Sequence, residues 1–72
     1  MPETIKTHKL LKLLKELGFG QVRQKGSHVF FQHPDGRTTL VPLHSEIRAK
    51  LLTKIIKQDL KMDKEEFFRK LG

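Results

Sequence analysis

Apolar residues recur along the chain with two different periods, and each period predicts one kind of secondary structure. Between residues 7 and 17, leucines fall three and four positions apart, with lysines between them. This spacing predicts an amphipathic helix. Its apolar stripe consists of Leu10, Leu11, Leu13, Leu14 and Leu17. Thr7 is expected to cap the helix, and Gly18 to follow its last turn, where a left-handed conformation costs glycine little.

The middle of the chain alternates between apolar and polar residues, which predicts strands. The expected strands cover residues 21–24, 27–33 and 38–41. Val22 is expected to point into the core from the first of them. The Lys25-Gly26 pair bends the chain into the second strand, and Pro34-Asp35-Gly36 has the composition of a tight turn before the third. Pro42 is expected to end the third strand.

The second strand carries different chemistry on its two faces. Strand alternation places Ser27, Val29, Phe31 and His33 on one face, and His28, Phe30 and Gln32 on the other. Val29 and Phe31 identify the first set as the core face. His28 and Phe30 are therefore expected on the solvent face.

The last third of the chain returns to helical spacing. A second helix is expected from Glu46 to about Asp59, directly after His44-Ser45. Its apolar residues are Ile47, Leu51, Leu52, Ile55 and Ile56. A short third helix begins at Asp63, which forms a capping-box pattern with Glu66. Its anchoring face consists of Phe67, Phe68 and Leu71.

The expected order is α-β-β-β-α with a short C-terminal helix. Three antiparallel strands joined by tight loops need cover on one face, which the two long helices can supply. The chain is thus predicted to be an α+β protein of the kind seen in double-stranded-RNA-binding domains. We expect one domain over residues 1–72, with a core of about 8–60 and a helical extension over 62–72.

The net positive charge of the chain indicates a negatively charged binding partner. The 72 residues include 15 lysines and arginines against 8 acidic residues, a formal net charge of +7. A small domain with this surplus is suited to a polyanion, and nucleic acid is favoured over an acidic membrane surface. The chain is too short to enclose a deep pocket, so a shallow site without an organic cofactor is expected.

Other compositional features exclude several classes of protein. Cysteine is absent, which rules out disulfides and thiolate metal sites. The start, Met1-Pro2-Glu3-Thr4, lacks a signal-peptide pattern, and no apolar run approaches the ~20 residues of a membrane span. A soluble, cytoplasmic protein is expected.

Catalytic chemistry is most plausible at His28. A histidine can take the proton of a ribose 2′-OH, while neighbouring cations stabilise the charge on the phosphate. Lys25 and Arg23 are the candidate phosphate ligands, and Gly26 bends the chain beside them. The same spacing also fits an ordinary exposed strand histidine. Phe30, on the same face, either stacks an unpaired base or is covered by strand twist or the C-terminal helix.

The other histidines are weaker candidates. His33 is expected to support the turn, His44 to precede the second helix, and His8 to lie on a helix surface. A metal site is not expected, because His28 and His33 fall on opposite strand faces and no acidic residue stands at ligand spacing. The lysines at positions 50, 54, 57 and 61 line one side of the second helix, either as a phosphate-binding row or as its solvated face.

Several motifs together resemble the HicA toxins, which are small mRNA interferases of type II toxin–antitoxin systems. In chain order they are Gly18-Phe19, Arg23-Gln24-Lys25-Gly26-Ser27-His28, His33-Pro34-Asp35-Gly36, Val41-Pro42 and His44. The similarity covers residues from about 8 to 60. The chain departs from the family pattern at Val29, where many members carry a second histidine, and at Arg48-Ala49-Lys50, where a glycine is common.

The resemblance implies a double-stranded-RNA-binding-like fold and RNA cleavage that needs neither metal nor ribosome. The catalytic histidine of the Gly-Ser-His motif falls on His28, while Gly26 and Ser27 shape the loop around it. The implied partners are RNA and a HicB-type antitoxin that covers the active-site face. We therefore expect an endoribonuclease toxin. A non-catalytic RNA-binding module of the same fold and a purely protein-binding domain are the alternatives.

Overall fold

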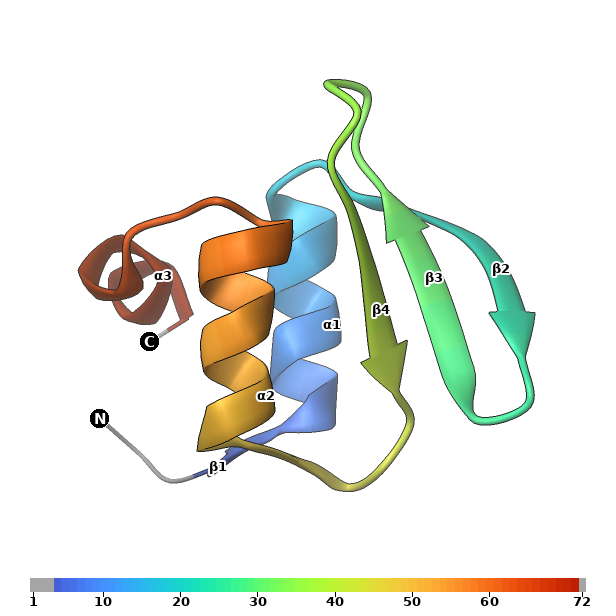
Figure 1. The fold of residues 1–72 in the computed structure, drawn as a ribbon, viewed down its shortest axis with the longest axis horizontal. Helices are drawn as coiled ribbons and strands as arrows, with labels where there is room; N and C mark the ends of the chain where they lie inside the picture. Colours follow the sequence, from blue (N-terminus) through green and yellow to red (C-terminus); the bar gives the residue numbers. More distant parts are fainter. Residues whose placement is uncertain (1–3, 72) are drawn as a thin grey trace.

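The computed structural model describes residues 4–71, so Met1–Glu3, where no signal-peptide pattern is expected, and Gly72 lie outside it. The described elements are β1 (Thr4–Lys6), α1 (Thr7–Glu16), β2 (Gly20–Lys25), β3 (His28–Gln32), β4 (Thr38–Pro42), β5 (Glu46–Arg48), α2 (Ala49–Lys54), the π-helix η1 (Ile55–Asp59) and α3 (Lys64–Leu71). Strands β2, β3 and β4 form an antiparallel sheet in that order, and β1 pairs with β5. The α+β architecture predicted from the sequence is confirmed (Figure 1). No helix within residues 4–71 is long and apolar enough to cross a membrane.

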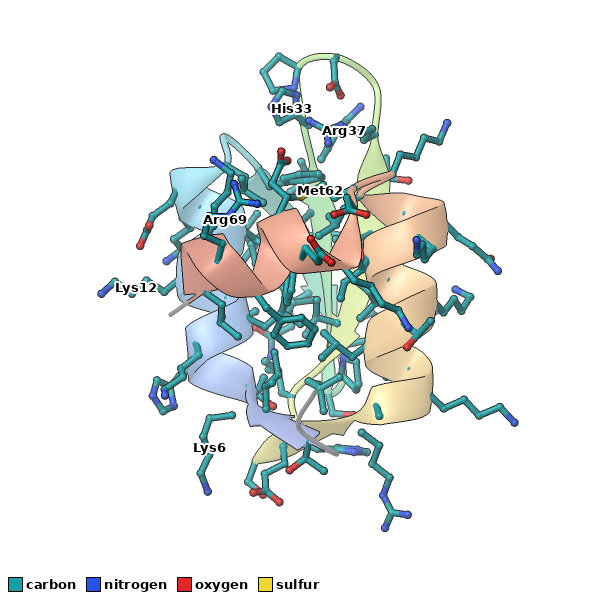
Figure 2. All side chains as sticks on the ribbon, turned by 90° about the vertical axis from the view of Figure 1, so that its left-hand side faces the viewer. Lys6, Lys12, His33, Arg37, Met62 and Arg69 are labelled. Carbon is teal, nitrogen blue, oxygen red and sulfur yellow. The ribbon has the colours of Figure 1, made fainter. Side chains whose placement is uncertain are left out.

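The elements stack in layers that leave one face of the larger sheet uncovered. Helices α1 and α2 lie on one side of the β2-β3-β4 sheet (Figure 1). Helix α3 crosses this helix pair on the side away from the sheet (Figure 2). We call the sheet face that packs on the helices the inner face and the opposite one the outer face.

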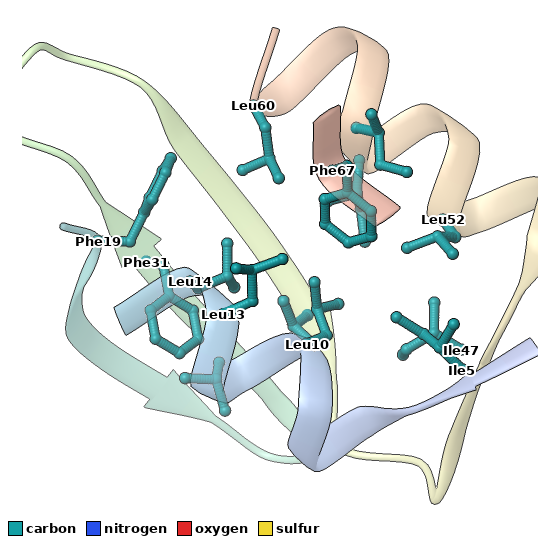
Figure 3. Close-up of a cluster of buried hydrophobic side chains, with 14 residues drawn as sticks. Ile5, Leu10, Leu13, Leu14, Phe19, Phe31, Ile47, Leu52, Leu60 and Phe67 are labelled. Atoms are coloured by element: carbon teal, nitrogen blue, oxygen red, sulfur yellow. The ribbon is translucent and has the colours of Figure 1, made fainter. Parts of the chain in front are cut away.

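The core lies between the inner face and the helices. Its buried apolar side chains, several of them labelled in Figure 3, are Ile5, Leu10, Leu13, Leu14, Phe19, Val29, Phe31, Val41, Ile47, Leu52, Ile55, Ile56, Leu60 and Phe67. Val29 and Phe31 come from the β3 face that strand alternation assigns to the core, so that prediction is confirmed. The leucine stripe of α1 supplies the opposite wall.

The first helix begins at the expected residue, but the hydrogen bonds that hold its start differ from the predicted cap. Thr7 is the first residue of α1, and the capping position before it is Lys6, which makes no side-chain cap. The Thr7 hydroxyl donates instead to the carbonyl of His44, and the Thr7 N–H donates to the carbonyl of Ser45 at 3.1 Å. The prediction of Thr7 as the cap is therefore wrong, because the buried threonine ties the helix start to the β4–β5 connection.

The helix ends as the sequence predicts. Gly18 adopts a φ of 100°, its N–H donates to the carbonyl of Lys15, and the N–H of Phe19 donates to that of Leu14. This pair of bonds is a Schellman motif, which satisfies carbonyls that the helix end would leave unpaired. Phe19 is buried, and strand β2 begins at the next residue.

The second helix begins later than predicted. Residues 46–48 form β5, which pairs with β1 so that Ile47 lies opposite Ile5 (Figure 3). Both isoleucines are buried, so their burial stabilises an extended conformation before Ala49 starts α2. Ile47 fits the helical period of the residues after it, and the short strand β1 carries little sequence signal. The prediction of helix from Glu46 is therefore wrong.

The end of the second helix widens into a π-turn. Helix α2 continues into η1 and ends at Asp59, close to the predicted end. The N–H of Leu60 donates to the carbonyl of Ile55 at 2.8 Å, and Lys61 then adopts a left-handed φ of 53°. Buried residues Ile55, Ile56 and Leu60 face the core through this turn.

The first strand of the sheet differs from its prediction at Val22. Strand β2 pairs Gln21 with Phe31 and Arg23 with Phe30, so Val22 is an extra residue in a β-bulge. Its side chain is 57% exposed rather than buried. The prediction that Val22 points into the core is wrong, because one extra residue reverses the facing that simple alternation gives.

Candidate active site

A two-residue hairpin loop positions the Gly-Ser-His segment. Lys25 pairs with His28 across β2 and β3, and Gly26 and Ser27 connect them. Gly26 has a φ of 60°, while Ser27 is not left-handed, the pattern of a type II′ turn, whose twist matches that of the strands. The N–H of Leu43 donates to the carbonyl of Ser27 at 2.6 Å. The loop is therefore held to the β4–β5 connection as well as to β2.

Pairing registers set rows of side chains across the outer face, and two of these rows carry the candidate site residues. The first row is Lys25, His28 and Pro42, and the second is Arg23, Phe30 and Leu40. His28 and Lys25 are exposed, so an imidazole and an ammonium group stand on neighbouring strands of the same uncovered face. Arg23 and Lys25 are two positions apart on β2 and share that face by strand alternation, because the register stays regular from the hairpin loop to Arg23.

Most of the expected site residues line one hollow of about 410 Å³. Its lining residues are Lys25, Gly26, Ser27, His28, Phe30 and Leu40. Arg23 is placed differently: its guanidinium carbon lies 4.7 Å from the centre of the Phe30 ring, in a cation–π contact. The structure thus groups His28 with Lys25, while Arg23 packs against Phe30.

Leu40 was not among the residues that the sequence indicated. It is 39% exposed and lies opposite Phe30 in the register. Alternation within residues 38–41 already places it away from the buried Thr39 and Val41, so the strand period carried a signal for it. Without the pairing register, nothing connected it with His28.

His33 belongs to the β3–β4 turn, as expected (Figure 2). Its Nε2 lies 3.1 Å from the carbonyl of Leu17, and its Nδ1 lies 3.1 Å from the N–H nitrogen and 3.0 Å from the Oδ1 of Asp35. A neutral ring donates from Nε2 to Leu17 and accepts the Asp35 N–H at Nδ1. A Cβ at Gly18 would come within 3.0 Å of Nε2, so glycine there makes room for the ring.

The remaining histidines and the lysine row lie elsewhere. His44 is exposed and lines a separate hollow of about 440 Å³ with Thr4, Ser45, Glu46 and Arg48. His8 is exposed on α1. Lys50, Lys54 and Lys57 belong to the helix that covers the inner face, away from the face that bears His28, and Lys61 follows it. Among residues 4–71, no three His, Asp or Glu side chains gather as a metal site requires.

These features define a class of protein: a small basic α+β domain with a histidine and cations on an uncovered sheet face. The family model of the HicA toxin of bacterial toxin–antitoxin systems matches residues 7–59. The chain belongs to the HicA toxin family, and it is the toxin of a toxin–antitoxin system, which implies an antitoxin partner. No curated protein sequence matches the chain significantly.

Proposed function

We propose that this toxin is an endoribonuclease, an mRNA interferase, with His28 as its acid–base group. The observation that carries the proposal is the position of His28 on the uncovered face, paired with Lys25 across a fixed two-residue loop. Both residues lie within the segment that matches the family. RNA is the substrate that the net charge of +7 favours.

The chemistry needs only groups that this face presents. His28 takes the proton of the 2′-OH as its oxygen attacks the adjacent phosphorus. The bond from phosphorus to the 5′-oxygen of the next nucleotide breaks, and that oxygen takes a proton from water. His28 then returns its proton to the solvent, and the products are a 2′,3′-cyclic phosphate and a 5′-OH end. Lys25 stabilises the negative charge that grows on the phosphate oxygens. Gly26 and Ser27 hold the loop at the phosphate, and Arg23 contributes positive charge from beside Phe30.

A HicB-type antitoxin is the proposed silencing partner. The outer face is uncovered by the chain's own helices, so a partner laid on it would block His28 and the hollow together. We expect the antitoxin to compete with RNA for this face. A ternary complex in which RNA binding persists at full affinity would contradict this mode of silencing.

The decisive experiment is the rate of RNA cleavage by the purified toxin and by His28→Ala. Acid–base help is worth roughly 10²–10⁴-fold, so the variant should lose about that factor in cleavage rate. Its RNA affinity should stay nearly unchanged, since Lys25 and Arg23 remain. A single 2′-deoxy nucleotide at the cut position should stop cleavage by the wild type, because the attacking oxygen is missing.

The control is His8→Ala, which removes an exposed imidazole from α1 and should cleave at the wild-type rate. An unchanged rate in His28→Ala would refute the catalytic assignment. A wild-type protein that binds RNA in a salt-sensitive way and never cuts it would be the non-catalytic module. A protein without RNA affinity at moderate salt would be a protein-binding domain.

A further inference from the structure

The hollow beside His28 has two apolar walls, although the sheet face around it is polar and cationic. Leu40 remains 39% exposed and Phe30 is only half-buried, although both side chains are large and apolar. Exposed apolar groups that gather in a concave place, rimmed by polar ones, mark a binding site more often than scattered ones do. Lys25 and His28 form part of the rim.

The Phe30 ring has two differently occupied sides. Arg23 packs on it from β2, with its guanidinium carbon 4.7 Å from the ring centre. Leu40 lies opposite it on β4 and lines the hollow with it, whereas Arg23 does not line the hollow. The arginine thus contacts the ring from the β2 side, and the hollow is lined by the ring together with Leu40 on the β4 side.

We propose that this hollow, bounded by Phe30 and Leu40, is a subsite for one unpaired nucleobase next to the phosphate held at His28 and Lys25. The inference rests on the proposed function and specifies its substrate as RNA that is single-stranded at the cut. A base is a flat, largely apolar ring that stacks on an aromatic side chain, and the two rows of the outer face that bound the hollow carry Arg23 and Lys25 and no carboxylate.

The need for an unpaired base follows from the shape of duplex RNA. In an A-form helix the bases are stacked inside and only their edges reach the shallow minor groove. A base enters a hollow on a sheet only if it leaves the stack, which costs least in a single strand. Unstacking also frees the sugar on that side to bring its 2′-OH into line with the phosphate.

The test uses a short single-stranded RNA that the toxin cuts at one mapped position. For binding, that position carries a 2′-deoxy nucleotide, and matched oligonucleotides carry an abasic residue on either side of it. Base–aromatic stacking is worth roughly 5- to 150-fold in affinity, so one abasic oligonucleotide should bind that much more weakly than its parent. Annealing a complementary strand should weaken binding and stop cleavage.

Leu40→Ala and Phe30→Ala remove the two walls, and each should weaken binding of the intact oligonucleotide. In both variants the abasic substitution should reduce the affinity little further, because the binding site of the base has already been removed. Val22→Ala is the matched control: Val22 is 57% exposed on the same sheet but lines a different hollow, with Gly18, Gly20, Gln32, His33 and Pro34. It should keep the wild-type affinity and the full abasic penalty. Thermal unfolding confirms that each variant is folded.

Binding and cleavage are read separately, so the two proposals fail in different ways. If the wild type never cuts RNA, the nuclease is overturned, and the abasic residue is instead moved position by position along the oligonucleotide; a penalty at one position that disappears in Leu40→Ala still supports the subsite. If the wild type cuts RNA but an abasic residue does not weaken its binding, the subsite alone is overturned. The same holds if Leu40→Ala keeps the full loss of affinity caused by the abasic residue. Loss of affinity for the antitoxin in Leu40→Ala, with RNA binding intact, would make the hollow a protein-docking site and also overturns it. Absence of any RNA binding overturns both proposals.

Discussion

Two histidines of one hairpin differ in how the fold holds them, and only one is a candidate for catalysis. Both nitrogens of His33 have partners in the fold, and its ring meets Phe19 edge-on at 5.1 Å between centroids. His28 stands on the outer face, five residues earlier, beside Lys25. The difference arises because alternation along the strand places the two histidines on opposite faces, and because the turn brings His33 against the end of α1.

Asp35 organises the same turn through its carboxylate. The pKa of Asp35 is lowered chiefly because the Arg37 N–H donates to Oδ1 at 3.0 Å. Loss of hydration raises the pKa and opposes this effect, while the Arg37 guanidinium, 2.7 Å from Oδ2, lowers the pKa further. Arg37 also donates to the carbonyl of Leu60 at 2.6 Å, so the turn is linked to the end of η1.

Asp35→Asn should reduce the acid sensitivity of the fold. A carboxylate whose pKa is lower in the folded state contributes stability above its unfolded value near pH 4 and loses it as the pH falls through the folded value. The variant lacks this contribution, so its urea midpoint should start lower at pH 7 and fall less between about pH 5 and pH 2. Glu65→Gln controls for the lost charge. Identical pH slopes for Asp35→Asn and wild type would contradict the prediction.

At the scale of elements, small local irregularities position the site. The type II′ turn fixes the spacing of Lys25 and His28, and the bulge beyond Arg23 turns Val22 outward. The β2 strand is exposed along its whole length, at the sheet edge farthest from the helices (Figure 1). Its bulge and its cations are features that discourage pairing with a foreign strand, so this edge is protected while its outer face stays accessible.

Lys61→Gly should stabilise the protein. Lys61 holds a left-handed φ of 53° directly after η1, which costs a residue with a Cβ roughly 1–2 kcal/mol. Glycine avoids this cost but loses more chain entropy on folding, so the net gain should be about 0.5–1 kcal/mol. Urea unfolding measures it.

The matched control is Lys57→Gly, which removes the same charge from inside η1, where glycine should cost about 1 kcal/mol. Equal effects of the two substitutions would show that charge, rather than backbone conformation, determines the result.

At the scale of the whole molecule, the layered arrangement separates stability from function. Helices α1 and α2 bury the inner face, and α3 closes the helix layer from the far side (Figures 1 and 2). The side chain of Phe67 is fully buried in the core, although it lies beyond the matched family segment of residues 7–59. The C-terminal helix is thus part of the packed structure, and the outer face is left uncovered by the chain's own helices.

Phe67→Ala should destabilise the protein by roughly 3–5 kcal/mol, since it empties a fully buried aromatic site. For a chain of this size that is a large part of a total near 4–11 kcal/mol. Thermal and urea unfolding measure the loss. Phe68→Ala, at a half-buried neighbour, should cost clearly less. A Phe67 variant as stable as wild type would mean that α3 contributes little to the core.

The sequence by itself determined those features that depend on local periodicity and turn chemistry. The leucine stripe predicted α1, alternation in residues 27–33 assigned Val29 and Phe31 to the core, and Gly18 was predicted at the helix end. The glycine bend and the cations near His28 also predicted that the candidate site lies in this one segment. Each of these features follows from residues within a few positions of one another, so a single sequence reveals them.

Only the tertiary structure decided features that depend on distant pairing. Ile47 became a strand residue because Ile5, more than forty positions away, lies opposite it, and Thr7 bonds a carbonyl at His44 instead of capping its own helix. Likewise the register of β3 with β4 brings Leu40 to Phe30, and the bulge turns Val22 outward. Local spacing carries no information about such partners, because the free energy that selects them comes from burial and pairing across the whole fold.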